Sequence, residues 1–321
     1  MKRDLGIVSV RPFALEDLDA LGEFCEEARA LDAGIEPFAH RLGLIATGPR
    51  ALLPLWRVAE GEDRVLYGLS FTALREARGE PAARGDRARS EGPRTTLEFY
   101  AAVHPRLRRQ GLGRALCEAA VEFVLQSPEP AALRTRVRDS AEAAPGRAFL
   151  AALGFAETAA QLQLAWNGRS SPEEPQLPAL KLRRATAADP KAAKDLQRLS
   201  DEAWAGAPDS FATRADEIAQ LFGEQGRLVL IAESEGRAIG YLSGIWLGKT
   251  LGIEEVAVLP DFRRAGVGRA LLCRALGQEK AAHAVLSVSE ANKPARALYR
   301  SLGFSQAARR VILELRSPVA T

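Results

Sequence analysis

The sequence predicts a mixed α/β protein built from two tandem copies of one domain. Its 321 residues suffice for two domains of ordinary size. The segment RRQGLGRAL at Arg108–Leu116 returns as RRAGVGRAL at Arg263–Leu271. Each copy follows an apolar run that ends in Val-x-Pro, and strand and helix patterns alternate in the same order around both. An internal repeat of this length predicts two domains of the same fold.

The expected elements of each copy follow one order. An opening strand and two helical stretches precede three strands; a helix then begins at the paired glycines, and a strand, a short helix and a last strand complete the copy. Apolar periods of two indicate the strands, and periods near 3.6 indicate the helices. The first copy has these elements at 5–11, 14–30, 37–47, 55–60, 64–74, 95–103, 111–126, 132–138, 144–152 and 159–166. The second has them at 180–184, 188–204, 213–223, 227–234, 237–247, 250–258, 266–279, 283–289, 293–301 and 307–315.

Two further landmarks align the copies. Gly68 in the strand pattern VLYGLSF corresponds to Gly240 in AIGYLSG, and the tripeptide Leu-Gly-Phe follows the short helix at 153–155 and at 302–304. The first copy has extra residues at 75–94, which are rich in Arg, Ala, Gly and Glu and have no apolar period. We interpret them as a solvated hairpin insertion, with contact to an anionic partner as the alternative.

A polar segment with three prolines, 167–178, separates the copies. This composition is typical of a semi-extended linker. We therefore expect an N-terminal domain at 1–167, a linker at 168–178 and a C-terminal domain at 179–321.

Composition excludes several classes of protein. With 47% hydrophobic and 26% charged residues, the chain is typical of a globular protein with a real core. The net charge of +3 is too small to predict a nucleic-acid partner. The three cysteines and three histidines are scattered without metal-ligand spacing, and no apolar run is long enough for a membrane span. We expect no metal site, no membrane segment, buried thiols and a cytoplasmic location; the oligomeric state stays open.

The repeated segment is suited to binding an anion. Its two glycines allow a sharp turn and close approach of the main chain, and the helix that follows presents unpaired N–H groups. Spacing argues against a Walker P-loop, which needs four residues between the glycines, and against a dinucleotide fingerprint, which needs a third small residue where Leu116 and Leu271 stand. The alternative is a helix start softened by glycine, with ordinary surface arginines. The candidate guanidinium donors are Arg108, Arg109 and Arg114 in the first copy and Arg263, Arg264 and Arg269 in the second.

In both glycine loops the sequence resembles the GNAT superfamily of acyl-CoA-dependent N-acyltransferases, whose signature Arg/Gln-x-x-Gly-x-Gly/Ala matches both copies. The resemblance implies two tandem domains, each with a mixed, splayed β-sheet flanked by helices, and acetyl-CoA (coenzyme A) as co-substrate. It also implies that loop amides hold the pyrophosphate, and that the strand before the loop contacts pantetheine. The residues implied are Val256, Val258, Arg263, Arg264, Ala265, Gly266, Val267, Gly268 and Arg269, with Val103, Arg108, Arg109, Gly111, Gly113 and Arg114 as their counterparts in the first copy.

The resemblance places catalytic groups in the second copy. Transfer needs a group that protonates the departing thiolate and a group that takes a proton from the amine. Tyr299 stands where the family commonly has its acid, Asn292 where it often has an asparagine near pantetheine, and Glu254 where some members have a base. Tyr299 as a half-buried helix residue, Asn292 as a helix cap and Glu254 as a surface carboxylate are the alternatives. By strand alternation, Glu255 points to the opposite face from Glu254.

The first copy has Leu150, Ala143 and Phe99 at the positions of these three groups, and none of them donates or accepts a proton. We therefore expect a catalytic C-terminal half and an N-terminal scaffold that can still hold coenzyme A. The layout resembles that of mycothiol synthases at the level of architecture alone.

The expected reaction is acetyl transfer to a primary amine of a small molecule or peptide. A non-catalytic acyl-CoA-binding module and a transferase of longer acyl groups are the alternatives. Family resemblance places the acceptor beside 204–211, where Trp204, Asp209 and Phe211 are candidates to line its site, with loop packing as the alternative.

Overall fold

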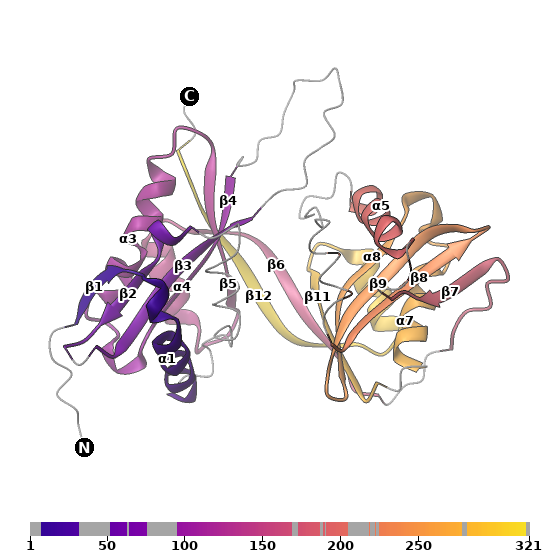
Figure 1. The fold of residues 1–321 in the computed structure, drawn as a ribbon, viewed down its shortest axis with the longest axis horizontal. Coiled ribbons are helices and arrows are strands. Elements are labelled where there is room, and N and C mark those ends of the chain that lie inside the picture. The colour runs from indigo at the N-terminus through magenta and orange to yellow at the C-terminus, as the bar shows by residue number, and fades with distance from the viewer. Residues whose placement is uncertain are drawn as a thin grey trace. The chain divides into compact units, whose positions relative to one another are not determined.

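The computed structural model describes residues 8–31, 52–62, 64–75, 95–168, 173–186, 189, 191–204, 218, 222, 225–277 and 281–318. The fold is mixed α/β, and the chain forms two compact units. The first unit takes its described residues from 8–75, 95–158 and 311–318, and the second takes them from 159–310. Each unit is a sheet with helices on it (Figure 1).

The first unit contains most of the first repeat. Its strands lie in the order β1-β2-β3-β4-β5-β12, and all pairs described by register are antiparallel except β4 with β5. That pair is parallel because helix α3 connects the two strands as a crossover. The elements are β1 (Ser9–Pro12), α1 (Leu18–Leu31), β2 (Arg57–Glu60), β3 (Leu66–Arg75), β4 (Thr95–Val103), α3 (Leu112–Leu125), β5 (Ala131–Arg138), α4 (Ala144–Ala152) and the end of β12 (Ser305–Arg316).

The second unit repeats this order. Its strands lie in the order β12-β6-β11-β10-β9-β8-β7, and β10 is parallel to β11 across the crossover helix α7. The elements are β6 (Ala156–Trp166), β7 (Leu180–Arg184), α5 (Ala192–Trp204), β8 (Arg227–Ser234), β9 (Arg237–Leu247), β10 (Thr250–Val258), α7 (Val267–Gly277), β11 (His283–Ser289) and α8 (Lys293–Ser301). The predicted and observed bounds agree at both ends for β4, α4, β7, β8, β9, β10, β11 and α8.

The last strands of the two repeats are exchanged. Strand β6 closes the first repeat in sequence, but from residue 159 it belongs to the second unit and pairs antiparallel with β11. Strand β12 closes the second repeat, but from residue 311 it belongs to the first unit, where the Ser317 amide donates to the carbonyl of Ala131 at 2.8 Å. In Figure 1 these are the long pink and yellow strands. Each unit is therefore completed by the last strand of the other repeat.

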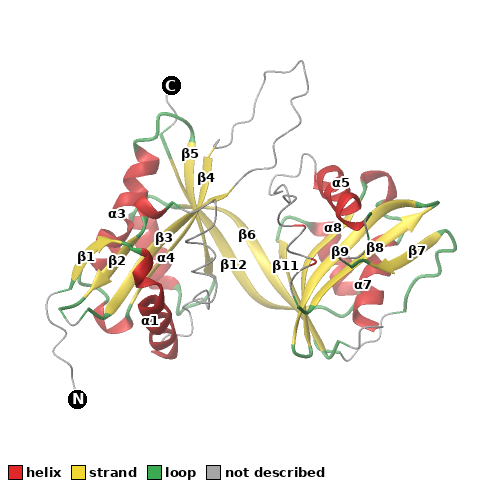
Figure 2. Ribbon diagram, in the orientation of Figure 1, coloured by secondary structure: helices red, strands yellow, loops and turns green. Residues whose placement is uncertain are grey.

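Two apolar clusters cover opposite faces of the sheet in the second unit. One packs against α7 and α8 and includes Val267, Leu271 and Tyr299. The other packs against α5 and includes Leu199 and Tyr241. Figure 2 shows helices on both faces of this sheet. The fold therefore separates a face covered by α5 from a face covered by α7 and α8.

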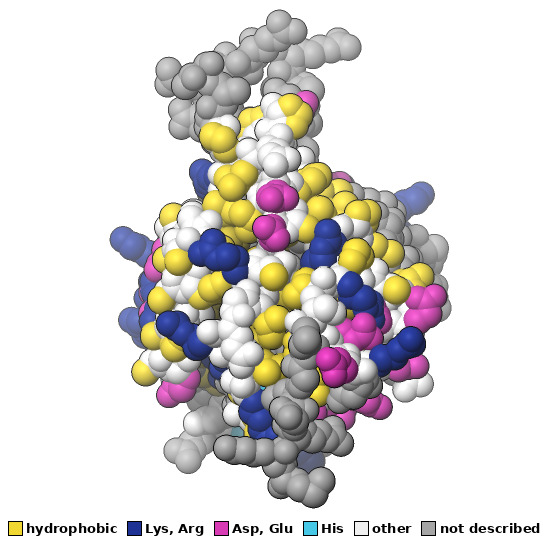
Figure 3. Space-filling view, turned by 90° about the vertical axis from the view of Figure 1, so that its left-hand side faces the viewer, with side chains coloured by type: hydrophobic (Ala, Val, Ile, Leu, Met, Phe, Trp, Pro, Cys, Tyr) yellow, Lys and Arg dark blue, Asp and Glu magenta, His cyan; other side chains and the backbone are white. Residues whose placement is uncertain are grey.

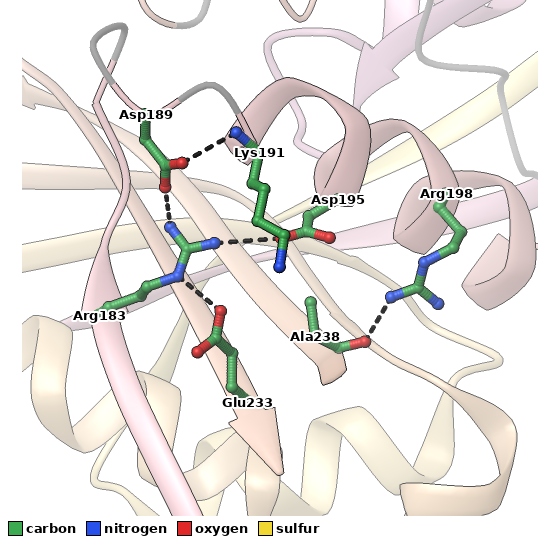
Figure 4. Close-up of polar contacts among 7 residues, drawn as sticks. All are labelled: Arg183, Asp189, Lys191, Asp195, Arg198, Glu233 and Ala238. Carbon is green, nitrogen blue, oxygen red and sulfur yellow. Dashed lines mark hydrogen bonds and ion pairs between the residues drawn. The ribbon is translucent and has the colours of Figure 1, made fainter. Parts of the chain in front are cut away.

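A half-buried arginine clamp holds α5 to the sheet (Figure 4). Arg183 of β7 donates to Asp189, to Asp195 of α5 at 3.1 Å and to Glu233 of β8 at 2.7 Å. Arg198 of α5 adds a bond of 2.6 Å to the carbonyl of Ala238. Charge-assisted hydrogen bonds of this kind are stronger than neutral ones and also restrict the orientation of the groups that they join. The first unit has the same clamp, in which Arg11 binds Asp17 and Glu60, each at 2.7 Å.

The surface shows no gathering of one charge on the face drawn in Figure 3, where Lys and Arg side chains alternate with acidic and hydrophobic ones. Within the described ranges, no helix combines the length and the apolar character that a membrane crossing requires. The same ranges contain no cluster of three or more His, Cys, Asp or Glu side chains able to hold a metal ion. All three cysteines are buried and free, as predicted, and burial raises the pKa of Cys25 to about 11 and of Cys117 to about 12.

Candidate active site

The two glycine loops have the same backbone. Each strand is followed by a 3-10 turn, Pro105–Leu107 or Pro260–Phe262, and the helix then begins at Leu112 or Val267. The first glycine of each loop is left-handed, with φ of 85° at Gly111 and 84° at Gly266. The residue two positions earlier is also left-handed in both, with φ of 69° at Arg109 and 67° at Arg264. Left-handed φ values are uncommon in residues other than glycine, so the two arginines show that both loops adopt the same unusual turn.

The first arginine of each loop binds the end of the preceding strand. Arg108 Nε donates to the carbonyl of Val103 at 3.3 Å, and Arg263 Nε donates to that of Val258 at 3.1 Å. Arg263 also donates through Nη2 to the carbonyl of Ala203 at 2.7 Å, which ties the loop to the end of α5. Its guanidinium therefore shapes the loop in this structure.

The other loop arginines differ in exposure. Arg109, Arg114 and Arg264 are exposed, and Arg269 is half-buried with its Nη1 donating to Ser301 Oγ at 3.1 Å. Exposed guanidinium groups beside a helix start suit an incoming phosphate.

The second glycine of each loop allows close helix packing. A Cβ on Gly113 would lie 3.3 Å from Phe149 Cζ, and one on Gly268 would lie 3.4 Å from Leu298 Cδ2. The helix after the loop thus packs directly on the short helix α4 or α8. A side chain larger than hydrogen at the second glycine would crowd this helix contact, so the packing favours glycine there in both copies.

The strand before each loop separates from its parallel neighbour. Pairing of β10 with β11 ends at Ile253 and Leu286, although the strands continue to Val258 and Ser289. Pairing of β4 with β5 ends equivalently at Glu98 and Arg134. We call this separation the fork. It leaves the main chain around Val256–Val258 without a strand partner on the β11 side, as the resemblance implied.

The forks differ in what lies just beyond the last pair. In the first unit, Arg136 Nη1 donates to Glu98 Oε2 at 2.9 Å, so an ion pair bridges the strands. In the second unit the last paired residues, Ile253 and Leu286, are buried and apolar. The fork of the second copy is therefore the one without an ionic bridge between these strands in the described residues.

Tyr299 lies on α8 within the cluster that packs against α7. It is 8% exposed, and its ring meets Phe304 edge-on at 5.8 Å. Burial raises the pKa of Tyr299 to about 12, so the phenol holds its proton at neutral pH and can donate it. Asn292 is exposed and caps α8, since its Oδ1 accepts from the Ala295 amide at 3.1 Å. The capping interpretation of Asn292 is thus confirmed.

Glu254 is exposed and forms an ion pair with Arg227. It is the extra residue of a β-bulge, because the register of β10 on β9 shifts between Ile253 and Glu255. Glu255 is half-buried and accepts a hydrogen bond from the hydroxyl of Tyr241. Sequence reasoning did not single out this pair, since a bulge has no local signature; the one available signal was a tyrosine inside a buried strand.

The first copy has no proton donor at the corresponding positions. Leu150 is buried, Ala143 precedes α4 without a side-chain cap, and Phe99 stacks on Phe155 at 5.9 Å. Hydrophobic packing fills the region that has Tyr299 in the second copy.

The linker lies along α7. Glu174 forms two hydrogen bonds to Arg274, of 3.0 and 2.9 Å, and the thiol of Cys273 lies 3.3 Å from the carbonyl of Glu173. Leu177 then reaches the loop, where its Cδ1 would lie 3.3 Å from a Cβ on Gly266. The corresponding position at Gly111 has nothing within 4 Å.

Several predicted features lie outside the described residues. These are the stretch 37–47, most of 213–223, the insertion after Arg75 as far as 94, and the candidate acceptor residues Asp209 and Phe211. Trp204, the third of those candidates, is half-buried at the end of α5.

Solved structures share this tandem arrangement. A tandem GNAT protein from the clavulanic acid biosynthesis pathway, solved without AcCoA, superimposes with a TM-score of 0.70 at 20% identity, covering 98% of this chain and all of that one (100%). A GCN5-related N-acetyltransferase from Sphaerobacter thermophilus gives a TM-score of 0.68 at 19% identity, covering 97% and 96%. At such identities the likeness establishes the fold.

Sequence relatives and the family model go further. A protein of Clavibacter michiganensis named mycothiol acetyltransferase is 31% identical over 89% of this chain and 87% of its own length. The model described as "Acetyltransferase (GNAT) family" matches residues 58–155 and again 194–304. Together with the repeated strand–loop–helix unit, these matches show that the chain belongs to the GNAT family and is an N-acetyltransferase.

Proposed function

We propose that the chain transfers the acetyl group of acetyl-CoA to a primary amine, and that the transfer takes place in its C-terminal half. The observation that carries this proposal is the apolar fork at Ile253 and Leu286, followed directly by the glycine loop and faced by a helix with a buried tyrosine. A non-catalytic acyl-CoA sensor would need no proton donor at that place.

The residues present fit coenzyme A. The loop Arg263–Arg269 offers helix-start amides and the exposed guanidinium of Arg264 to a diphosphate. The main chain around Val256 and Val258 has no strand partner on the β11 side, where an amide-bearing arm could pair with it. When bound, acetyl-CoA supplies an activated acetyl thioester.

Tyr299 is the proposed donor of a proton to the departing sulfur. Burial keeps the phenol neutral, because a pKa of about 12 leaves it protonated throughout the neutral range. Asn292 holds the start of α8, the helix that carries Tyr299, and its role toward the coenzyme is part of the proposal. A donor positioned in this way contributes roughly 100- to 10,000-fold to a rate.

The N-terminal half serves as a scaffold in this proposal. It keeps the loop Arg108–Arg114 but has an ion pair at its fork and Leu150 in place of the phenol. As for the acceptor, the name that the relatives share favours an amine related to mycothiol over an amine of a protein.

A matched pair of loop variants tests the assignment. Gly266→Val and Gly111→Val introduce the same backbone strain, because both glycines have φ near +85°, and the side chain at 266 also meets Leu177. We expect Gly266→Val to abolish acetyl-CoA consumption, read as free thiol release with a panel of primary amines, and Gly111→Val to leave it near the wild-type rate. Loss of activity in Gly111→Val alone would place the chemistry in the other half, and a wild-type chain that consumes no acetyl-CoA with any amine would favour the sensor.

A further inference from the structure

Two of the linker residues that contact the C-terminal half each precede a proline. They are Glu174, before Pro175, and Leu177, before Pro178. A residue before proline is biased toward extended backbone, and proline itself fixes φ. This pattern favours a stiff extended segment, and the structure has neither helix nor strand there. We call the segment Glu173–Leu177 the strap.

The strap runs antiparallel to α7. Its first residues lie beside Cys273 and Arg274, late in the helix, and Leu177 lies beside Gly266, just before the helix begins. The helical path from Gly266 to Arg274 rises roughly 12 Å, and an extended chain from Glu174 to Leu177 spans roughly 10 Å. Because the two lengths match, the strap has little slack between its two attachments.

The first attachment is an ion pair on α7. Arg274 donates to Glu174 through Nε at 3.0 Å and through Nη2 at 2.9 Å, a paired geometry that restricts the orientation of both groups. Beside it, the thiol of Cys273 lies 3.3 Å from the carbonyl of Glu173 and is buried. This end of the strap therefore covers the thiol.

The second attachment is an apolar contact with the glycine loop. Leu177 Cδ1 and Pro175 Cγ lie 3.3 and 4.0 Å from the position of a Cβ on Gly266. The carbonyl of Leu177 also accepts a hydrogen bond of 2.9 Å from the amide of Leu180, the first residue of β7. Gly266 is half-buried, whereas its counterpart Gly111 is exposed. Leu177 is thus fixed between β7 and the loop.

The loop has a backbone that needs support from its surroundings. Arg264 is left-handed with φ of 67°, a conformation that is costly for a residue with a side chain and that persists only where neighbouring groups hold it. Arg263 holds the loop from the side of α5, through the carbonyl of Ala203. The strap packs on it at Gly266. Amides at a helix start bind an anion only while this arrangement is kept.

The first copy lacks the groups to which the strap attaches. In the alignment set by the two glycine loops, Ala119 of α3 stands in place of Arg274, and Glu118 stands in place of Cys273. An alanine offers nothing to a carboxylate. Among the described residues, none lies within 4 Å of a Cβ on Gly111. Support of this kind therefore belongs to the half that is proposed to bind acetyl-CoA.

We propose that the strap holds the glycine loop of the C-terminal half in the conformation that binds acetyl-CoA, with Leu177 as the positioning residue and the pair of Glu174 and Arg274 as the anchor. This inference rests on the part of the proposed function that puts acetyl-CoA in that half. By linkage, a strap that favours the binding conformation of the loop is itself favoured by the ligand. Bound acetyl-CoA therefore keeps the strap docked and the thiol of Cys273 covered.

Calorimetric titration of the full chain with acetyl-CoA measures the effect on binding. Leu177→Ala removes the contact with the loop, and we expect the Kd to rise roughly 10-fold, as for a loop that is competent about one tenth of the time. Glu174→Gln removes the ionic anchor, and we expect a rise of roughly 3-fold because the pair is partly exposed. Gln176→Ala, on the exposed side of the strap, is the matched control and keeps the wild-type Kd.

Steady-state thiol release separates positioning from catalysis. With ethylamine, benzylamine and glucosamine as acceptors, we expect the KM for acetyl-CoA in Leu177→Ala to rise in parallel with the Kd. The kcat should stay within about twofold of the wild type, because the strap contacts the loop and no reacting atom. A merely structural role would lower the melting temperature and leave the Kd unchanged.

Alkylation of Cys273 by N-ethylmaleimide, read by mass spectrometry of its peptide, reports on the strap without any measurement of activity. We expect saturating acetyl-CoA to slow alkylation of the wild type by up to roughly the same 10-fold factor, because the coupling is reciprocal. In Leu177→Ala the rate should rise, and acetyl-CoA should no longer change it. Cys25 and Cys117, buried in the first unit, are internal controls whose rates stay constant.

The outcomes separate this inference from the proposed function. Acetyl-CoA binding by the wild type, with the same Kd in Leu177→Ala and Glu174→Gln, overturns the role of the strap alone. Protection of Cys273 that persists in Leu177→Ala means that the ligand covers the thiol directly, and overturns the coupling. A wild type that binds acetyl-CoA but acetylates no amine overturns the proposed function and leaves the strap to be judged by the Kd. No binding by the wild type overturns both.

Discussion

Removal of one carboxylate near the C-terminus should destabilise the N-terminal unit. Glu314 lies on β12 within the first unit, and its Oε1 is 3.2 Å from Arg134 Nε. The two side chains are 7% and 10% exposed, so Glu314→Ala leaves the Arg134 guanidinium in a buried place without that carboxylate. Breaking a buried pair on one side costs about 3–5 kcal/mol. Because Arg134 has further interactions, we expect Glu314→Ala to lower the free energy of unfolding of the first unit by about 3 kcal/mol, at the low end of that range.

The assay must report on each unit separately. Hydrogen exchange read by mass spectrometry does so, with peptides from β4 and β5 for the first unit and from β8 and β9 for the second. With an m-value of about 2 kcal/mol per M urea, a loss of about 3 kcal/mol lowers the unfolding midpoint of the first unit by about 1.5 M. The peptides of the second unit should keep their protection.

Glu290→Ala is the control for this experiment. Glu290 pairs with Arg309 at 2.9 Å, but the two side chains are 40% and 28% exposed. Glu290→Ala should therefore lower the free energy of unfolding by less than about 1 kcal/mol. An unchanged midpoint in Glu314→Ala, or weaker protection in the second unit alone, would refute the exchange of β12 into the first unit.

Two further predictions concern protonation. Tyr299→Phe should lower kcat about 100-fold or more while acetyl-CoA still binds, and Leu150→Met should change neither constant; steady-state kinetics with calorimetry measures both. The hydrogen bond from Arg11 is the main reason that the pKa of Asp17 is lowered from 3.8. The ionised Asp17 therefore stabilises the first unit fully above pH 3.8, and this stabilisation is lost as pH falls through the lowered pKa. Urea unfolding between about pH 5 and pH 2 should therefore show the first unit losing stability, with a shallower slope in Arg11→Gln.

Local sequence determines most of the elements. Strands β4 and β10 have the predicted bounds because a turn residue follows each alternating run. Pro105 follows β4, and Pro260 follows β10. The helix after each loop begins within one residue of its predicted start, since a glycine in the left-handed region ends the turn before it. Both signals lie within a few residues of the feature they predict.

Features that depend on distant residues were not predictable. Strand β6 has an apolar alternation that would suit either sheet, and only its pairing with β11 decides which unit it completes. The bulge at Glu254 arises from the register between two strands, so strand alternation gave opposite faces to the two glutamates without showing that Glu255 would meet Tyr241. The contact of Leu177 with Gly266 likewise needs the path of the linker in space.

The persistence of the loop in both copies has a structural cause that does not involve a ligand. Arg108 and Arg263 each bind the last carbonyl of the preceding strand, and Gly113 and Gly268 each allow a helix contact. These demands alone would keep the motif in a copy that never meets coenzyme A, so the motif cannot report on binding by itself.

The fork is the better indicator, because Glu98 and Arg136 bridge it in the first copy. We therefore expect calorimetric titration with acetyl-CoA to give one site per chain, and Gly266→Val to remove it. Two sites in the wild type, or one site that survives in Gly266→Val, would show that the bridged fork opens to admit the coenzyme. The half-buried ion pair of 2.9 Å would then be too weak a barrier to distinguish the halves.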